Sequence, residues 1–328
     1  MKIPFSFGFA SLIRLYFPGL FLSILTFPVF SEIFKKIPFL KDLSNPDYIL
    51  LEAIFWGIIL YALDDIIYRI FEGRMLWPSF LFNWRVKKEN KYIEKHLKLN
   101  KKIKEEGKIG SHEYRELWYK LRLFPIGKDS EYTAAYPTRL GNIIQGYEQY
   151  PGSRYGLDAV FSWYRIWLKL DKDVKGEIDN VLAKADFAVY SSFVFFVSFV
   201  FNIIACIIKC LQGKGIIYLL PLPSCQTLLI VALLSLILGY LFYRLSCPLH
   251  RFYGEYFKSI FDLNKNSISE ISEYFGVNEQ ERKRTMELTR YLQYHKTKCP
   301  NCGKLNSGYL DKCKHCGTET PKVFKSSP

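Results

Sequence analysis

Residues 187–208 read FAVYSSFVFFVSFVFNIIACII and contain no charged side chain. A helix needs about 20 apolar residues to cross the hydrocarbon core of a bilayer, where it satisfies its backbone hydrogen bonds internally. The stretch therefore predicts a membrane-spanning helix. A second uncharged run, Thr227–Tyr243, is rich in Leu and Ile and follows closely, so the two are predicted to form a transmembrane hairpin.

Two further apolar segments, Leu15–Phe34 and Tyr48–Ile67, lie near the start of the chain and predict another hairpin. Met1–Phe34 lacks the basic start, short apolar core and small-residue cleavage site of a secretory signal, so we expect its apolar part to remain as a span. The predicted fold is an all-α integral membrane protein, in which two transmembrane hairpins flank a cytoplasmic helical domain and a small zinc ribbon follows at the C-terminus.

The distribution of charge predicts the orientation. The chain has 45 Lys and Arg against 31 Asp and Glu, and 22 of the basic residues lie between Arg74 and Lys184. Because basic residues are enriched in cytoplasmic segments, we expect this region and both termini in the cytoplasm. The predicted parts are 1–71 for the first hairpin, 72–186 for the cytoplasmic domain, 187–245 for the second hairpin, 246–296 for a helical tail, 297–318 for the zinc ribbon and 319–328 for a loose terminus.

The cytoplasmic domain is predicted to begin with a pair of charged helices. Apolar residues recur at helical spacing over Tyr92–Ile103 with basic residues between them, and Gly107–Ser111 ends the pattern. Ser111 is a suitable cap for a second helix, which stops before Pro125. We therefore expect a helical hairpin here.

The strongest local motif is CPNCGKLNSGYLDKCKHCG at residues 299–317, with candidate ligands Cys299, Cys302, Cys313 and Cys316. Two-residue spacing within each pair turns both thiolates toward one ion, and four thiolates complete a tetrahedral zinc site with no position open for a substrate. We expect a structural Zn²⁺ that supplies the folding energy of a module too small to bury a core. Two partners remain open for this basic ribbon, a cytoplasmic protein, which we favour, and a nucleic acid.

The other cysteines are Cys206, Cys210, Cys225 and Cys247, which lie in or beside apolar segments. Isolated thiols in such segments are usually small buried hydrophobic groups. We therefore expect no disulfide framework.

A polar network is predicted within residues 136–170, YPTRLGNIIQGYEQYPGSRYGLDAVFSWYRIWLKL. Charged and amide side chains stand there among glycine and aromatic residues, namely Arg139, Asn142, Arg154, Asp158 and Arg165. Two interpretations remain open: an ion-paired network that fixes the domain, which we favour, or a pocket for an anionic ligand. No His lies in the stretch to serve as a general base.

Asp64, Asp65 and Asn202 form a candidate intramembrane polar site in the predicted spans. Carboxylates in a membrane are costly and often mark ion pathways. Asp65 and Arg69 are also four residues apart, which suits a simple pair on the surface of an interfacial helix. Asn202 suits either a hydrogen bond between helices or the wall of a pore in an oligomer.

Three short elements carry a family resemblance: YRIFEG at residues 68–73, PTRLGN at 137–142 and YGLD at 155–158. Together they resemble an uncharacterised family of bacterial four-span membrane proteins. The resemblance implies this layout and a bacterial-type inner (plasma) membrane, and it implies no activity. YRIFEGRMLW at residues 68–77 also resembles, locally, the stretch after the second membrane helix of bestrophin-type anion channels.

Two functional interpretations follow. Four spans and a domain built between the hairpins favour a regulated channel-like or membrane-effector protein that works as a homo-oligomer in the bilayer. The alternative is a membrane-anchored scaffold that recruits a partner through the zinc ribbon. An enzyme is not favoured, because scattered histidines show no catalytic or metal-binding spacing: His96, His112, His250 and His295.

Overall fold

A computed structural model describes residues 10, 12–34, 44–109, 111–125, 132–155, 159–213, 222–274, 296–299, 301–302, 305–307, 313 and 315–318. In chain order its elements are the π-helix η1 (Leu12–Tyr16), α2 (Phe17–Phe34), α3 (Asn45–Ala62), α4 (Asp64–Glu72), α5 (Ser79–Glu105), α6 (His112–Leu121), α7 (Arg139–Glu148), α8 (Tyr150–Tyr155), α9 (Ala159–Lys169), α10 (Lys172–Gly213), α11 (Cys225–Tyr274), β1 (Lys296–Lys298) and β2 (Leu305–Ser307). The described part of the chain is therefore mostly helical. It divides into two units, one formed by Met1–Gln149 and Trp167–Phe257 and the other by Tyr150–Ile166 and Lys258–Pro328.

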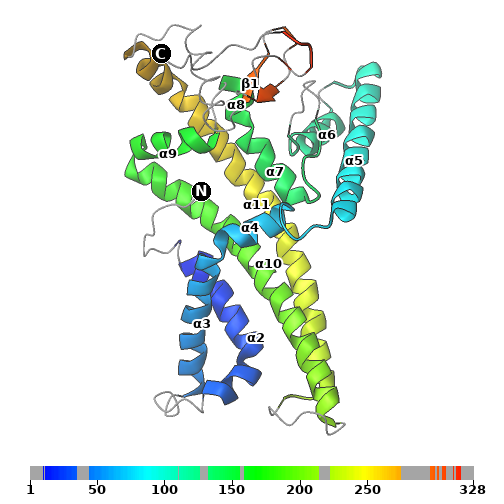
Figure 1. The fold of residues 1–328 in the computed structure, drawn as a ribbon, viewed down its shortest axis with the longest axis vertical. Helices are drawn as coiled ribbons and strands as arrows, with labels where there is room; N and C mark the ends of the chain where they lie inside the picture. The colour runs from blue at the N-terminus through cyan, green and yellow to red at the C-terminus, as the bar shows by residue number, and fades with distance from the viewer. Residues whose placement is uncertain are drawn as a thin grey trace. The chain divides into compact units, whose positions relative to one another are not determined.

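In the first unit, α2 packs on α3, and α10 runs beside α11 (Figure 1). Gly19 permits the first contact, because a Cβ there would lie 2.4 Å from the carbonyl oxygen of Ala53. Small residues of this kind let membrane helices approach closely. In the second contact, the Ser192 hydroxyl of α10 donates a hydrogen bond to the Gly239 carbonyl of α11 at 2.8 Å.

In the part of the chain that the structure describes, two helices are long and apolar enough to cross a membrane, α10 over Lys172–Leu211 and α11 over Cys225–Asn264. Only 33% of the most apolar part of α10 and 22% of that of α11 are buried within the protein. Neither helix therefore resembles the core helix of a soluble domain, which is mostly covered. The apolar helix near the N-terminus is shorter, at Leu12–Thr26. Two segments of spanning length are thus confirmed, and four crossings in two hairpins remain a prediction.

The predicted segment Tyr48–Ile67 is divided in the structure. α3 ends at Ala62 and α4 begins at Asp64, with Leu63 between them at φ −92° and ψ 3°. The first turn of α4 holds Asp64 and Asp65, whose carboxylates are favoured by the positive end of the helix dipole. The two acids therefore start a new helix, which turns away from α3 (Figure 1).

α5 and α6 confirm the predicted pair of charged helices. The Ser111 hydroxyl caps α6 by accepting a hydrogen bond from the Tyr114 N–H at 3.2 Å. Ile93 of α5 and Leu121 of α6 are fully buried in one apolar cluster with Phe124. Charged side chains therefore cover a small common core.

The second unit contains α8, most of α9, the end of α11 and the two strands. Trp163 of α9 stacks on Phe261 of α11 with ring centroids 6.2 Å apart. The Tyr150 hydroxyl donates a hydrogen bond to the Asp262 carboxylate at 2.8 Å. β1 and β2 pair in antiparallel register, with Thr297 opposite Asn306. Aromatic and polar contacts thus join the helical parts of this unit.

Candidate functional site

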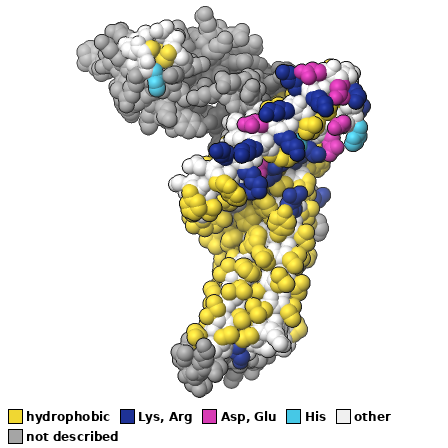
Figure 2. All heavy atoms as spheres, turned by 90° about the vertical axis from the view of Figure 1, so that its right-hand side faces the viewer, with side chains coloured by type: hydrophobic (Ala, Val, Ile, Leu, Met, Phe, Trp, Pro, Cys, Tyr) yellow, Lys and Arg dark blue, Asp and Glu magenta, His cyan; other side chains and the backbone are white. Residues whose placement is uncertain are grey.

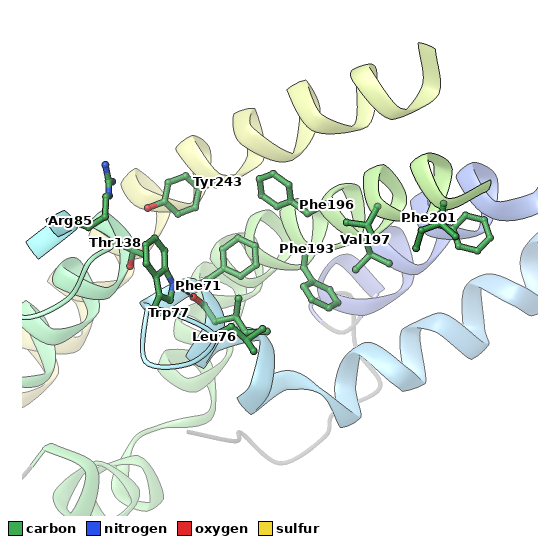
Figure 3. A pocket seen from close by; sticks show the side chains of 13 residues that line it. Phe71, Leu76, Trp77, Arg85, Thr138, Phe193, Phe196, Val197, Phe201 and Tyr243 are labelled. Carbon is green, nitrogen blue, oxygen red and sulfur yellow. Dashed lines mark hydrogen bonds between the residues drawn. The ribbon is translucent and has the colours of Figure 1, made fainter. Parts of the chain in front are cut away.

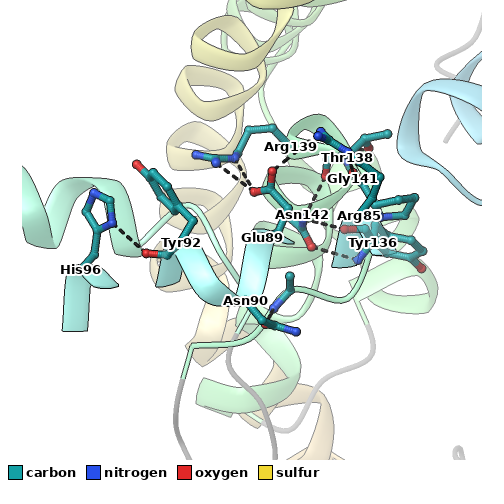
Figure 4. Close-up of polar contacts among 12 residues, drawn as sticks. Arg85, Glu89, Asn90, Tyr92, His96, Tyr136, Thr138, Arg139, Gly141 and Asn142 are labelled. Atoms are coloured by element: carbon teal, nitrogen blue, oxygen red, sulfur yellow. Dashed lines mark hydrogen bonds and ion pairs between the residues drawn. The ribbon is translucent and has the colours of Figure 1, made fainter. Parts of the chain in front are cut away.

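The PTRLGN motif forms the start of α7, where its polar side chains gather (Figure 4), and it contacts the end of α4. Thr138 Oγ1 accepts a hydrogen bond from the Gly141 N–H at 3.0 Å and donates one to the Glu72 carbonyl at 2.9 Å. A Cβ at Gly141 would lie 2.1 Å from that same carbonyl oxygen. Gly73 ends α4 at φ +86°, and a Cβ there would lie 2.5 Å from Pro137 Cγ. YRIFEG and PTRLGN, two of the stretches that carry the family resemblance, therefore pack on each other.

Asn142 fixes the loop that precedes α7. Its Oδ1 accepts hydrogen bonds from the N–H groups of Ala135 and Tyr136 at 2.8 and 2.9 Å. Its Nδ2 donates to the carbonyls of Tyr136 and Thr138, both at 2.9 Å. Four hydrogen bonds saturate the buried amide, so Asn142 has a structural role.

Arg139 attaches α7 to α5. Its Nε and Nη2 lie 2.9 and 2.8 Å from Oε2 of Glu89, and its guanidinium lies 4.4 Å from the centroid of the Tyr92 ring. Paired donors and an aromatic face suit the planar guanidinium better than an ammonium group. Arg139 thus also serves the packing of the helices.

The other three members of the predicted network are Arg154, Asp158 and Arg165. Arg165 is exposed on α9. The side chain of Arg154 and the whole of Asp158 lie outside the described residues. For Arg139 and Asn142, the contacts agree with a network that fixes the domain.

A buried ionic cluster, which no local sequence pattern predicts, joins the N-terminal segment to α10. Arg14 of η1 places Nε 2.6 Å from Asp186 Oδ2 and Nη2 3.0 Å from Asp179 Oδ1. Tyr68 of α4 donates a hydrogen bond to the other oxygen of Asp186, and its hydroxyl lies 3.1 Å from Nε2 of His250 in α11. We call Arg14, Tyr68, Asp179, Asp186 and His250 the juxtamembrane cluster, because most of them border the predicted spans.

The hydrogen bonds assign the tautomer of His250. The proton of Tyr68 points to Asp186, so His250 donates from Nε2 and leaves Nδ1 unprotonated. That Nδ1 has no hydrogen-bond partner among the residues that the structure describes. Burial lowers the pKa of His250 to about 3. Burial also raises the pKa of Asp186 to about 6, although Arg14 and Tyr68 oppose the rise.

Each of the three candidate intramembrane residues has a partner within the protein. Asp64 accepts a hydrogen bond from the Tyr190 hydroxyl. Asp65 pairs at 2.9 Å with the arginine four residues later, on an exposed helix surface. Asn202 is buried on α10 and donates to the carbonyl and hydroxyl of Ser198 at 2.8 and 3.2 Å.

The four thiols of the C-terminal motif lie together as predicted, with their Sγ atoms within 4.8 Å of one another: Cys299, Cys302, Cys313 and Cys316. We call these residues the four-cysteine cluster. Sγ–Sγ distances of 3.5 Å separate the first from the fourth and the second from the third. Zn–S bonds of about 2.3 Å in a tetrahedron imply S–S distances of about 3.8 Å, so the thiols fit one ion with small adjustments. A hydrogen bond with the Thr318 hydroxyl lowers the pKa of Cys316, which favours the thiolate. The cluster is thus suited to bind a metal ion.

Three of the remaining thiols also meet. Cys206 and Cys210 lie one turn apart on α10, Cys225 begins α11, and their Sγ atoms are within 4.8 Å of one another. The Sγ atoms of Cys210 and Cys225 are 3.5 Å apart. Cys206 is buried and Cys210 is exposed. The expectation that these thiols are isolated is therefore wrong, because the hairpin brings two distant positions of the chain together, whereas Cys206 is buried as expected.

A pocket of about 710 Å³ runs along α10 (Figure 3). Arg85 and Thr138 lie at one end, and Phe201 lies at the other. Val200 and Ile204 also line it and are 52% and 50% exposed, so the pocket is open along the helix. Hydrocarbon suits such a lining better than water does.

The first unit also carries a broad hydrophobic face, which ends at a band of Lys and Arg (Figure 2). Exposed side chains from α10 and α11 contribute to the face, including Val197, Val200, Ile204, Leu229, Ile230, Leu233, Leu234 and Ile237. Exposed lysines of α5 contribute to the band: Lys87, Lys88, Lys91, Lys95 and Lys98. A hydrophobic belt with a basic border is typical of a protein that lies in a bilayer.

Comparisons of the chain with models of protein families, with curated proteins and with solved structures find no match. The family resemblance of the sequence therefore stays a prediction.

Proposed function

We propose that the chain is a four-span protein of a bacterial-type plasma membrane, with spans at Leu15–Phe34, Tyr48–Ile67, Phe187–Ile208 and Thr227–Tyr243. Both termini and residues 72–186 then lie in the cytoplasm. The hydrophobic face supports this placement, since its aliphatic side chains are about half exposed and lipid would cover them. The basic border of the face supports the orientation.

We propose that the protein acts in that membrane as a regulated effector. It is channel-like, because several copies assemble around a permeation path or perturb the bilayer. The juxtamembrane cluster carries the proposal. Arg14 precedes the first proposed span and Asp186 directly precedes the third, so their ion pair ties the two hairpins together at the cytoplasmic surface. Removing one partner of a buried pair typically costs about 3–5 kcal/mol, because the other charge is left buried without its counter-ion. Release of this tie is the regulated step.

The path lies between copies of the chain. Asp64, Asp65 and Asn202 each have a partner within the protein, so they support no path between the helices of one copy. The joint of α4 with α7 connects the end of the second span to the cytoplasmic region. A signal sensed by that region would therefore reach the tie through α4, which also holds Tyr68.

Ion efflux from liposomes tests the effector proposal. Purified wild type, Arg14→Met and Asp65→Asn are reconstituted at equal density. Asp65→Asn is the matched control, because its ion pair with Arg69 has side chains 66% and 58% exposed and such pairs contribute little. We expect Arg14→Met to raise efflux and Asp65→Asn to match wild type. If all three insert and none releases ions, the effector proposal is wrong.

A second candidate is a membrane-anchored scaffold, which the four-cysteine cluster favours. We propose that the ion is Zn²⁺ with a structural role and that the folded ribbon recruits a cytoplasmic protein, in preference to a nucleic acid. Cross-linking in cells would compare the full chain with a variant lacking residues 297–328. The scaffold proposal expects the partner to be lost while membrane insertion is unchanged, and an undiminished cross-link would contradict it.

A further inference from the structure

The outer end of the α10–α11 hairpin carries a thiol pair. Cys210 lies in the last turn of α10 and Cys225 is the first residue of α11, with their Sγ atoms 3.5 Å apart. A disulfide joins two sulfurs about 2.05 Å apart, so these two sulfurs would have to approach by about 1.5 Å. We propose that Cys210 and Cys225 form a disulfide that closes this end of the hairpin; the proposal rests on the four-span orientation above.

Cys206 is the third thiol of the group, and its surroundings separate it from the pair. It is 8% exposed and belongs to an apolar cluster with Ala205, Leu222 and Leu228. A buried thiol among aliphatic side chains behaves as a small hydrophobe. Cys210 is exposed, so an oxidant can reach it. Accessibility therefore selects Cys210 as the thiol that reacts first.

The course of α11 in the chain indicates on which side of the membrane Cys210 and Cys225 lie. This helix begins at Cys225 and contains the fourth proposed span, and the four-cysteine cluster follows it in the chain. Four metal-binding thiolates must stay reduced, which fits the cytoplasm. One crossing of the membrane separates that cluster from the pair, so Cys210 and Cys225 lie on the outer, oxidising side.

The oxidant is a disulfide-bonded thiol oxidoreductase of the outer compartment. The Cys210 thiolate attacks one sulfur of that disulfide, forming a mixed disulfide and releasing the other sulfur as a thiolate. The Cys225 thiolate then attacks Sγ of Cys210 and displaces the oxidoreductase. Two electrons and the two thiol protons pass to the oxidoreductase, which leaves as a dithiol.

Counting free thiols in the full chain tests the proposal. Cells are quenched in acid and the protein is denatured with a chelator, then labelled with a maleimide polymer that shifts its mass on a gel. The chain has eight cysteines, so the disulfide leaves six labelled before reduction and eight after it. Eight labels without reductant would overturn the proposal. It would also be overturned if the purified chain bound a second equivalent of metal that Cys206→Ser removes, because the three thiols would then hold a metal ion.

Two variants give matched controls. Cys206→Ser should show five labels before reduction and seven after it, because the pair is intact. Cys225→Ser should show seven labels in both conditions, since Cys210 has lost its partner. Seven labels in Cys206→Ser without reductant would show that Cys206 is one of the oxidised thiols and would also overturn the assignment.

A separate measurement isolates the orientation. In a chain with Cys206, Cys210, Cys225 and Cys247 replaced by Ser, Lys214→Cys is labelled in intact cells with an impermeant maleimide. If Lys214→Cys is labelled in intact cells but wild type shows eight free thiols, the disulfide is rejected and the orientation stands. If Lys214→Cys is not labelled until the cells are lysed, the orientation and the disulfide are both overturned.

Discussion

Replacing Gly141 by Ala tests the joint between α4 and α7, and Gly146 of the same helix supplies the control. Ala is more favourable than Gly in a helix interior by about 1 kcal/mol, so helix propensity alone would stabilise both variants. At Gly146 the added Cβ would meet its nearest atom, the Leu123 carbonyl oxygen, at 3.5 Å, which is an ordinary contact. At Gly141 it would meet the Glu72 carbonyl oxygen at 2.1 Å, so one backbone must move.

The expected magnitude follows from these contacts. Overpacking costs about 1–3 kcal/mol. Separation of the helices also breaks the hydrogen bond from Thr138 to Glu72, which contributes about 0.5–1.5 kcal/mol. After the helix gain is subtracted, Gly141→Ala should lower the free energy of unfolding by about 2 kcal/mol, whereas Gly146→Ala should raise it by up to about 1 kcal/mol. Denaturant unfolding in mild detergent measures both, and equal effects would refute the joint.

Three further predictions concern the buried cluster and the hydrophobic face. Arg14→Met leaves Asp179 and Asp186 without their cation and should destabilise the fold by about 3–5 kcal/mol. Asp186→Asn keeps Arg14 paired with Asp179 and should destabilise the fold by about 1–3 kcal/mol. Denaturant unfolding measures both variants, and a larger loss for Asp186→Asn would contradict the geometry. The pKa of His250 is about 3 in the folded chain against 6.5 normally, so the unfolded chain binds the proton first as the pH falls. From pH 6.5 to 5, wild type should therefore lose about 1.6 kcal/mol of stability relative to His250→Gln. A difference that does not change with pH would show that this imidazole is not buried as described. Val200→Asp should make the free energy of membrane insertion less favourable by about 2.5–3.5 kcal/mol, so less of the protein should resist carbonate extraction. Leu263→Asp changes an 82% exposed position outside the proposed spans and should have no effect. Equal extraction of both variants would contradict lipid contact at Val200.

Features decided by neighbouring residues were predictable from the sequence. The start of α6 follows from the hydroxyl of Ser111, which caps a backbone group three residues later. The four-cysteine cluster follows from two C-x2-C pairs, because each tight turn presents two thiols to one point. The structural role of Asn142 follows less directly, since its four hydrogen bonds depend on the path of the preceding loop.

Features formed by distant residues were not predictable in the same way. Tyr68 meets Asp186 and His250 across 118 and 182 residues of chain, so no local spacing signals the juxtamembrane cluster. The sequence contains one signal of this cluster. Arg14 and Asp186 both border predicted spans, where a charged side chain needs a partner. Cys225 likewise meets Cys210 only because α10 and α11 run side by side.

The number of membrane crossings is the claim on which the proposed function depends. It is tested by single-cysteine labelling in the chain whose Cys206, Cys210, Cys225 and Cys247 are replaced by Ser. An impermeant maleimide is applied to intact cells carrying Lys41→Cys, Lys98→Cys or Lys214→Cys. Four crossings predict labelling at positions 41 and 214, with position 98 labelled only after lysis. If position 41 were also labelled only after lysis while position 214 reacted in intact cells, only α10 and α11 would cross, and the tie between two transmembrane hairpins would be wrong.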